Sequence, residues 1–509
     1  MKNFIQHSIK RFFILACFGI SGFMLLSADE PTRIELVESD SMMFDRRIGE
    51  DVRRLIGNVH FRHEETNMFC DSAYLFSATN SIRAYGNIFI EVSDTVSIFG
   101  DELYYNGNTR KAELTGNVEM IDNQMTLTTG HLLYDMNSNT AKYVNGGRIV
   151  DAENDLTSIW GFYYADDKHF FFKDSVKLVN PEYVMRSDTL KYNTLNEVAY
   201  FFGPTTIISD ENSIYCENGW YDTRNDISRF SKNAFLTNNE QSLTGDSLFY
   251  DRNKGFGRAE RNIQVRDSVQ NTLITGHLAE HFEKEGLSVV TKEAMLIIIE
   301  ETDSLFMHAD TLKSTYDEDK DERIVFAYHR GRFFRDDLQG QSDSIVYNFA
   351  DSTIYLFHNP VVWSDEHQLT ARRMEIKTSD NRVESARLFD AAFIISQEDT
   401  LGFNQVKGRK LVGHFRENEL RQIDVFGNGE TLYYVREEDG SMVGINKALA
   451  SDIIIFVEDR QVTGIRFLQN PDANLFPPEE ISREERLLRD FHWLEDIRPR
   501  SKADIFIWP

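Results

Sequence analysis

The feature that most constrains this chain is a repeat of about 29 residues. Gly-Asn pairs recur at Gly57-Asn58-Val59, Gly86-Asn87-Ile88 and Gly116-Asn117-Val118, at spacings of 29 and 30 residues. The same place in later repeats is occupied by Gly146, Gly203, Lys232-Asn233, Arg261-Asn262 and, more loosely, His358-Asn359. A short unit repeated in this way predicts a stack, in which each unit buries its apolar face against its neighbours.

A second landmark lies between the Gly-Asn pairs. Gly100-Asp101-Glu102-Leu103-Tyr104-Tyr105 and Gly245-Asp246-Ser247-Leu248-Phe249-Tyr250 share one pattern. Tyrosines recur at intervals of 28 to 31 residues, at Tyr74, Tyr105, Tyr134, Tyr164, Tyr192, Tyr221 and Tyr250. This spacing predicts that the tyrosines of neighbouring repeats line up in a column.

Within each repeat the apolar residues alternate with polar ones. The alternating apolar positions of one segment are Ala112, Leu114, Gly116, Val118 and Met120. An alternation with period two is typical of a strand that has one side in a core and the other in water.

In the second segment of each repeat the alternation slips by one residue. Val96 and Ile98 are even-numbered, whereas Leu103 and Tyr105 are odd-numbered. Such a slip exposes the apolar face unless the strand bulges or turns a corner. We expect the corner at Gly100, Gly130 and Gly245, because glycine tolerates the backbone angles required.

The predicted fold is therefore all-β. Each repeat contributes two long strands that fold at their middle, and stacked hairpins form an elongated antiparallel jelly roll, or β-taco, with two facing sheets. The predicted parts are a signal peptide at 1–28, the regular repeats at 29–315, an acidic loop at 316–323, divergent repeats at 324–476 and a C-terminal helical cap or tail at 477–509.

The two ends differ from the repeats. Lys2, Lys10 and Arg11 precede an apolar run and then small residues, which is typical of an export signal. Near the other end, residues 479–494 follow Pro477-Pro478 and predict an acidic amphipathic helix that caps the stack. Its apolar side would hold Ile481, Leu487, Leu488 and Phe491.

Charge and cysteine content exclude several classes of protein. Acids outnumber bases 82 to 55, for a net charge of −27, which argues against a nucleic-acid partner. Cys70 and Cys216 lie five repeats apart, too far for a disulfide, so we expect both to be free, buried thiols.

An export signal followed by Gly-Asn-Val and Gly-Asp-Ser-Leu-x-Tyr hairpin repeats resembles the OstA-like family of periplasmic lipopolysaccharide transport proteins. The resemblance covers Leu55 to Asn271 well and the later repeats loosely. It implies a creased two-sheet jelly roll whose groove carries the acyl chains of lipopolysaccharide. It also implies a periplasmic protein, peripheral to membranes, that can associate with the outer membrane and pairs its edge strands with other Lpt-type proteins.

The expected lipid groove is lined by inward residues of the regular repeats. The candidates are Ile88, Ile90, Ile98, Val118, Met120, Leu127, Leu132 and Tyr134. Lys232, Arg261 and His358 stand where other repeats have glycine, and could contact phosphate groups at the groove mouth or point into water at the corner. The rival interpretation is a structural or adhesive envelope solenoid in which the same apolar residues fill a closed core.

An enzymatic function is not favoured. Gly245-Asp246-Ser247-Leu248 spells a hydrolase signature, but equivalent repeats have Glu102 or Thr189 in place of the serine. A carbohydrate-active β-helix would need acids clustered in one cleft, whereas here they are dispersed. We predict no catalytic residues, no metal site and no cofactor.

Overall fold

The computed structural model describes residues 32–44, 49, 51–122, 125–193, 195–210, 212–300, 303–317, 322–379, 382–398, 402–417, 419–437, 440–458 and 461–509. The expected signal peptide, residues 1–28, and positions 318–321 of the expected acidic loop lie outside the described residues. The contacts divide the chain into two compact units, one ending at Ala112 and one beginning at Glu113. Each unit is described by itself.

The described residues form 36 strands and three short 3-10 turns, which confirms the all-β fold class. The first unit contains β1 (Glu35–Glu38), β2 (Ser41–Phe44), β3 (Val52–His63), β4 (Thr66–Phe76), β5 (Ser81–Glu91) and β6 (Val96–Asn106). Strand β7 (Lys111–Asp122) spans the boundary between the units.

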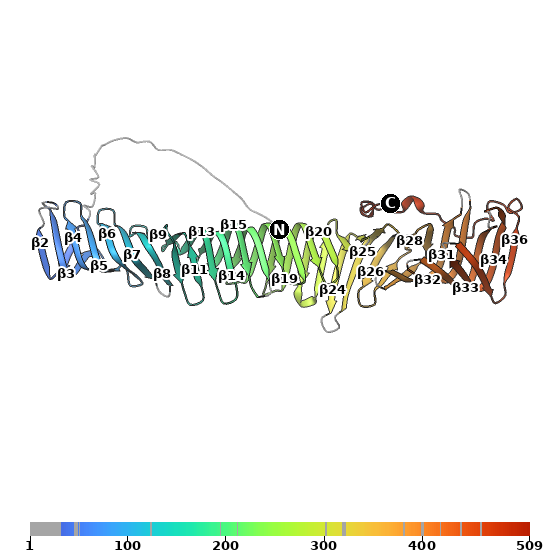
Figure 1. The fold of residues 1–509 in the computed structure, drawn as a ribbon, viewed down its shortest axis with the longest axis horizontal. Coiled ribbons are helices and arrows are strands. Elements are labelled where there is room, and N and C mark those ends of the chain that lie inside the picture. The colour runs from blue at the N-terminus through green and yellow to red at the C-terminus, as the bar shows by residue number, and fades with distance from the viewer. Residues whose placement is uncertain are drawn as a thin grey trace, which may run out of the picture. The chain divides into compact units, whose positions relative to one another are not determined.

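The second unit continues with antiparallel strands that follow one another along its length (Figure 1). Its earlier strands are β8 (Met125–Asp135), β9 (Thr140–Tyr143), β10 (Gly147–Val150), β11 (Asp155–Ser158), β12 (Trp160–Tyr164), β13 (His169–Val179), β14 (Val184–Asn193), β15 (Val198–Ile208), β16 (Ser213–Asp222), β17 (Ile227–Thr237), β18 (Gln241–Asp251), β19 (Phe256–Asp267) and β20 (Thr272–Phe282).

The later strands of the second unit are more varied in length. They are β21 (Leu287–Thr291), β22 (Met295–Ile298), β23 (Leu305–His308), β24 (Thr311–Asp317), β25 (Glu322–Arg335), β26 (Leu338–Asn348), β27 (Thr353–Phe357), β28 (Val361–Ser364), β29 (His367–Thr370), β30 (Arg373–Ser379), β31 (Arg382–Gln397), β32 (Phe403–Arg416), β33 (Glu419–Arg436), β34 (Met442–Glu458), β35 (Gln461–Leu468) and β36 (Asp472–Phe476). The 3-10 turns are Glu283–Glu285, Glu495–Ile497 and Asp504–Phe506.

Alternate long strands, such as β3, β5, β17 and β19, are creased at their middle by two successive residues in the left-handed region. Gly86 and Asn87 have φ angles of 76° and 46°, and both oppose the single residue Asp101 of the next strand. The two left-handed residues keep the inward phase of β5 from Ala84 to Ile88, whereas the strand opposite, with one residue fewer, slips by one between Gly100 and Leu103. The one-residue slip predicted from the sequence therefore belongs to a β-bulge, and it lies on the strand that has one residue opposite two.

The corner residues themselves differ from the prediction. The left-handed residues are the Gly-Asn landmark on one strand, and Gly100, Gly130 and Gly245 on the other strand are not among them. The strand with the Gly-Asn pair carries the extra residue, and therefore it alone needs left-handed angles.

A carboxylate fastens the crease between adjacent strands. The Asn87 side-chain amide donates to Asp71 at 2.8 Å, and the Asn262 amide donates to Asp246 at 3.1 Å. Asn58 with Asp40 and Asn233 with Glu217 repeat this contact at 3.0 and 2.8 Å. The two sequence landmarks therefore meet in space, which explains why they recur together.

The predicted tyrosine column is wrong at two places. Tyr74 and Tyr164 point outward, where Tyr74 packs edge-on against Tyr85 and Tyr164 stacks on His169. The inward position belongs to their neighbours Leu75 and Tyr163, both buried. The inward residues, Leu75, Tyr105, Tyr134, Tyr163, Tyr192, Tyr221 and Tyr250, are spaced by 29 or 30 residues.

The turns define two edges on the side away from the crease. Edge A contains the turns at 64–65 and 92–95 in the first unit and at 180–183, 238–240 and 268–271 in the second. Edge B contains those at 77–80 and 107–110 in the first unit and at 165–168, 223–226 and 252–255 in the second. Because a creased strand runs from one edge to the other, the mouth between the two sheets lies between edges A and B.

The expected amphipathic helix at 479–494 is absent, and that prediction is wrong. The segment consists of turns and runs back over the outer face of the second unit (Figure 1). The Gln405 amide pairs with Arg486 O and Leu488 N at 2.8 Å each, and the Gln368 amide pairs with His492 O and Leu494 N. These side chains take the backbone groups that a helix would use.

The same segment buries only part of its expected apolar side. Ile481 and Leu488 are buried against Phe393 and Ile395, and Phe491 packs beside them, but Leu487 is 41 % exposed. We call residues 477–509 the strap. It covers the outer face of the sheet instead of capping the end of the stack.

The crease predicts a sharp contrast between two glycines of the second unit. Gly203 has φ +79°, and an added Cβ would lie 2.9 Å from Asp188 Cβ, whereas Gly130 has no atom within 4 Å of such a Cβ. We expect Gly203→Ala to lower the free energy of unfolding by about 1–3 kcal/mol. Gly130→Ala serves as the control and should change it by less than about 0.5 kcal/mol. Melting curves of the purified variants measure both, and equal shifts would contradict the crease.

Candidate functional site

All eight residues predicted to line the groove are buried side chains of the inward phase. Their exposures range from 0 % for Ile90 to 3 % for Tyr134. Such burial means that they pack against other protein atoms, so a lipid chain could reach them only by displacing neighbours. Their contact with lipid stays a prediction.

Contacts across the mouth accompany this burial in the first unit. His63, at the edge A end of β3, lies with Nδ1 2.7 Å from the Tyr105 hydroxyl near edge B. Arg110 of edge B forms an ion pair with Glu64 of edge A at 2.9 Å. The two edges therefore meet, and the mouth is closed here.

The second unit has two such bridges, far apart along the chain. The Tyr163 hydroxyl donates to Asp122 at 2.6 Å, and Arg323 Nη1 lies 2.5 Å from Asp267 Oδ2. Between them, the hydrogen bonds of the described turns run along a single edge, as Asn180 to Asn154 and Tyr250 to Glu283 do. Tyr183 of edge A lies close enough to Tyr192 and Tyr221 of edge B to interact with them electrostatically.

A row of partly exposed apolar residues occupies this interval. Six residues pair side by side across strands β15 to β20 on the inward phase, Ile207, Ile214, Leu236, Leu243, Val265 and Ile274. Their neighbours in the same row, Met185 before and Leu296 after, are buried. We call this accessible part of the interior the trough.

The opposite wall of the trough alternates large and small residues. Tyr192, Tyr221 and Tyr250 pair with Ala199, Ser228 and Gly257 in one cross-strand row. Phe201, Phe230 and Leu248, nearer the crease, are buried beneath them. Ala199 and Ser228 are buried between the tyrosines, so the tyrosine rings cover them and form the accessible surface of this wall.

The phenol groups of this wall are partly desolvated. Burial raises the pKa of Tyr250 to about 12, and it also raises the pKa of Tyr192 and of Tyr221. All three are neutral at physiological pH. The rim is thus apolar in its rings and polar at its hydroxyl tips, which suits the boundary between an acyl chain and water.

The residues of the trough were part of the predicted repeats but were not singled out. Their pattern matches that of Ile90 or Met120, which are fully packed. What distinguishes them is that no hydrogen bond or ion pair between described residues joins the two edges above them, and this depends on residues distant in sequence. The closed mouth could have been recognised from residues that bond across it, which are His63 with Tyr105 and Glu64 with Arg110.

The three predicted phosphate contacts lie on the crease. Lys232, Arg261 and His358 are exposed residues with left-handed angles, and Arg261 pairs with Asp246 at 3.2 Å. The crease is the strand middle, whereas the mouth lies at the strand ends. The geometry therefore places them at the water-facing corner, and their contact with phosphate stays a prediction.

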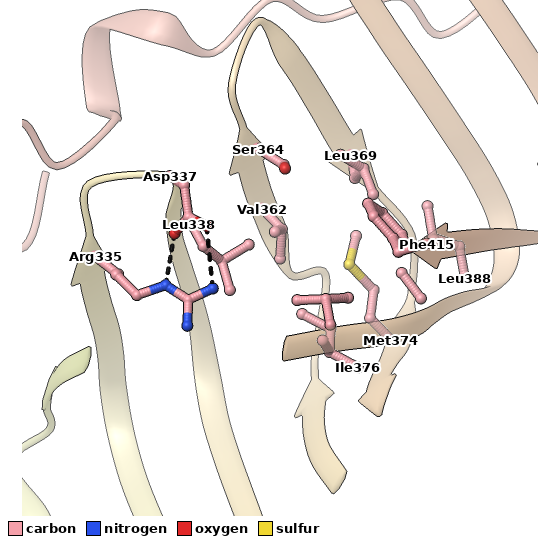
Figure 2. Close-up of a pocket in the computed structure, with 12 residues that line it drawn as sticks. Arg335, Asp337, Leu338, Val362, Ser364, Leu369, Met374, Ile376, Leu388 and Phe415 are labelled. Atoms are coloured by element: carbon pink, nitrogen blue, oxygen red, sulfur yellow. Dashed lines mark hydrogen bonds and ion pairs between the residues drawn. The ribbon is translucent and has the colours of Figure 1, made fainter. Parts of the chain in front are cut away.

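A second apolar space lies farther along, between β26 and β33. Two small adjoining hollows are both lined by Leu369, Leu388 and Phe415. Figure 2 shows the Phe415 ring beside Leu369 and Met374, with Arg335 bonded to Asp337 on another side. The Arg335 side chain is 7 % exposed and also pairs with Glu300.

The hydrolase-like serine is part of the repeat structure. Ser247 is buried and accepts a hydrogen bond from Arg229 Nε at 2.9 Å. Asp246 holds Asn262 at the crease. Both residues that resemble a catalytic signature are thus used to join strands.

Two further searches concern the described residues alone. Within them no group of three or more histidine, cysteine, aspartate or glutamate residues is arranged to hold a metal ion. No helix in the described ranges has the length and apolarity needed to cross a membrane.

Comparison with known families adds a decisive observation. Residues 31–188 and 184–246 match the OstA-like protein family. Through these residues the chain belongs to the OstA-like family. The family is periplasmic in general, is associated with lipopolysaccharide transport and acts by transport and bridging, not by catalysis. No curated protein matches the chain.

The two thiols provide a test of the packed interior. Cys70 and Cys216 are free and buried, as expected, and burial raises the pKa of Cys70 to about 12 and that of Cys216 to about 11. At pH 8 only about a thousandth of the Cys216 thiol is ionised, so we expect both to resist maleimide in the native protein. Both should react at once in guanidinium. A Cys17→Ser variant leaves Cys70 and Cys216 as the two thiols that can react with maleimide. Rapid labelling of Cys216 in the native protein would show that the interior wall is open there.

Proposed function

We propose that this chain is a non-catalytic periplasmic lipid-binding protein of lipopolysaccharide transport, and that its trough takes up acyl chains of lipopolysaccharide or a related envelope glycolipid. The supporting observation is the row from Ile207 to Ile274, in which inward apolar residues remain partly exposed. Family membership supports the same envelope location and transport role.

The energetics favour an aliphatic ligand. Each methylene removed from water contributes about 0.8 kcal/mol, so a chain laid over several residues of the row gains affinity steadily. The apolar rings of Tyr192, Tyr221 and Tyr250 would cover its other side. Their hydroxyl groups lie at the polar rim, where those of Tyr221 and Tyr250 donate to Asp226 and Glu283.

Exposed bases on edge B offer contacts for an anionic head group. Arg224, Arg252 and Lys254 lie in turns beside Tyr221 and Tyr250, and their side chains are more than half exposed. Arg224 and Arg252 pair with the partly exposed acids Glu197 and Asp226, and such pairs contribute little to stability, whereas Lys254 pairs with the buried Asp251. Phosphate groups could therefore replace Glu197 and Asp226 at small cost, despite the net charge of −27.

The ends of the sheets suit pairing with other Lpt-type proteins, which we propose as partners. β2 pairs with β3 and exposes Met42, Met43 and Phe44, while β36 pairs with β34 and exposes Leu475. A strand with a free edge and exposed apolar residues is a ready template for a strand of a partner. We also propose that the protein is exported and can associate with the outer membrane, and that its segments divide at the boundaries the sequence predicts.

The second candidate function is a structural envelope solenoid with a filled core. The near-complete burial of the inward residues from Ile88 to Tyr134 favours it for that part of the chain. It differs from the first candidate in one respect, because a solenoid with a filled core captures no lipid anywhere along its interior.

Site-specific photo-crosslinking in cells distinguishes the two. We expect a photoreactive phenylalanine at Leu243 to capture lipopolysaccharide several-fold more than one at Thr244, its neighbour on the outer face. Met120 in the packed part should capture little. In binding assays, Leu243→Asp should weaken lipid affinity about tenfold or more, because its carboxylate would lie in the apolar row.

The control is Thr244→Asp, which should leave lipid affinity unchanged. Equal capture at Leu243 and Thr244, or none at either, would contradict the lipid function and favour the filled solenoid.

A further inference from the structure

The apolar row of the trough ends abruptly on its C-terminal side. Ile274 pairs with Leu296, Leu296 with Met307 and Met307 with Phe333, so the row itself continues. However, these three residues have exposures of only 0–1 %. Accessible surface therefore changes to packed core within one strand spacing.

A fixed ion pair crosses the mouth at the same place. Asp267, at the edge A end of β19, accepts from Arg323 of β25, from Gln241 Nε2 at 2.9 Å and from the backbone N–H of Val269 and Gln270. The Arg323 guanidinium lies over the Tyr316 ring, with its Cζ 5.5 Å from the centroid. Side chains held from several directions keep one geometry, so this bridge is a stable barrier.

The other end of the trough is closed in a similar way. Met185 is buried, and the Tyr163–Asp122 hydrogen bond joins the two edges before it. The accessible strands, β15 to β20, span about 24 Å at about 4.8 Å per strand. The hollows beside Phe415 lie beyond the packed block formed by Leu296, Met307 and Phe333.

From these observations we infer that the trough is a compartment with closed ends, which selects its ligand by the length of the apolar chain. The Asp267–Arg323 bridge and Leu296 form its C-terminal end. This inference rests on the proposed lipid binding. It differs from a continuous groove, through which a chain of any length could pass.

The test measures affinity against chain length. A fluorescent fatty acid is bound to purified full-length protein that has been freed of lipid. Saturated fatty acids of increasing length then displace it. For the unaltered chain, affinity should rise about fourfold for each added methylene and then level off when the trough is full. Two variants open the C-terminal end of the trough. Arg323→Met with Asp267→Leu removes the bridge without leaving an unpaired buried charge, and Leu296→Ala removes the wall residue.

The expected result is that both variants level off at a longer chain than the unaltered protein. Arg148→Met with Asp155→Leu removes an exposed ion pair between β10 and β11, outside the trough, and should leave the levelling point unchanged. Melting curves establish that each variant is folded. If the variants bind but level off at the same length, or if the unaltered chain never levels off, the compartment is overturned while lipid binding stands. If no fatty acid binds the unaltered chain, both proposals fail.

Discussion

The crease in the middle of each strand is the constraint on which the rest of the structure depends. An apolar alternation can serve two facing sheets only if the inward phase survives the change of sheet. The pair of left-handed residues does this on one strand, and the single opposed residue accounts for the slip on the next. Asn87 bonded to Asp71, and its equivalents, hold adjacent creases in register. Interior, edges and mouth all follow from this local geometry.

Much of the fold could be predicted from the sequence because the repeat encodes the crease directly. Period two, the slip and the Gly-Asn pair gave two facing sheets. The predictions are wrong where a one-residue shift of strand phase, or a contact with a residue distant in sequence, determines the structure. Tyr74 and Tyr164 were chosen by type, although strand phase places Leu75 and Tyr163 inside. The helix expected at 479–494 has suitable propensity, but Gln368 and Gln405 bind its backbone from positions more than 80 residues away.

The candidate site was the least predictable part because every repeat presents the same apolar phase. Ile90 and Leu243 occupy comparable inward positions, yet one is packed and the other partly exposed. The difference comes from the edges. Where an acid or histidine of edge A reaches a tyrosine or arginine of edge B, the sheets close. Such contacts join strands that are not neighbours, such as β3 with β6 and β19 with β25. The period of the repeat contains no information about them.

The strap shows how the same sheet can be stabilised from its other side. Gln339, Trp363, Gln368, Ile395, Gln405 and Leu432 form a cross-strand row on the outer face. Its glutamines bond the strap, and its apolar residues lie beneath it. Strands covered on both faces remove apolar side chains from water on both sides, which stabilises this part of the sheet. The strap bonds to β26, β29 and β32, so the trough strands β15 to β20 lie outside its cover and bury apolar side chains on their inward face.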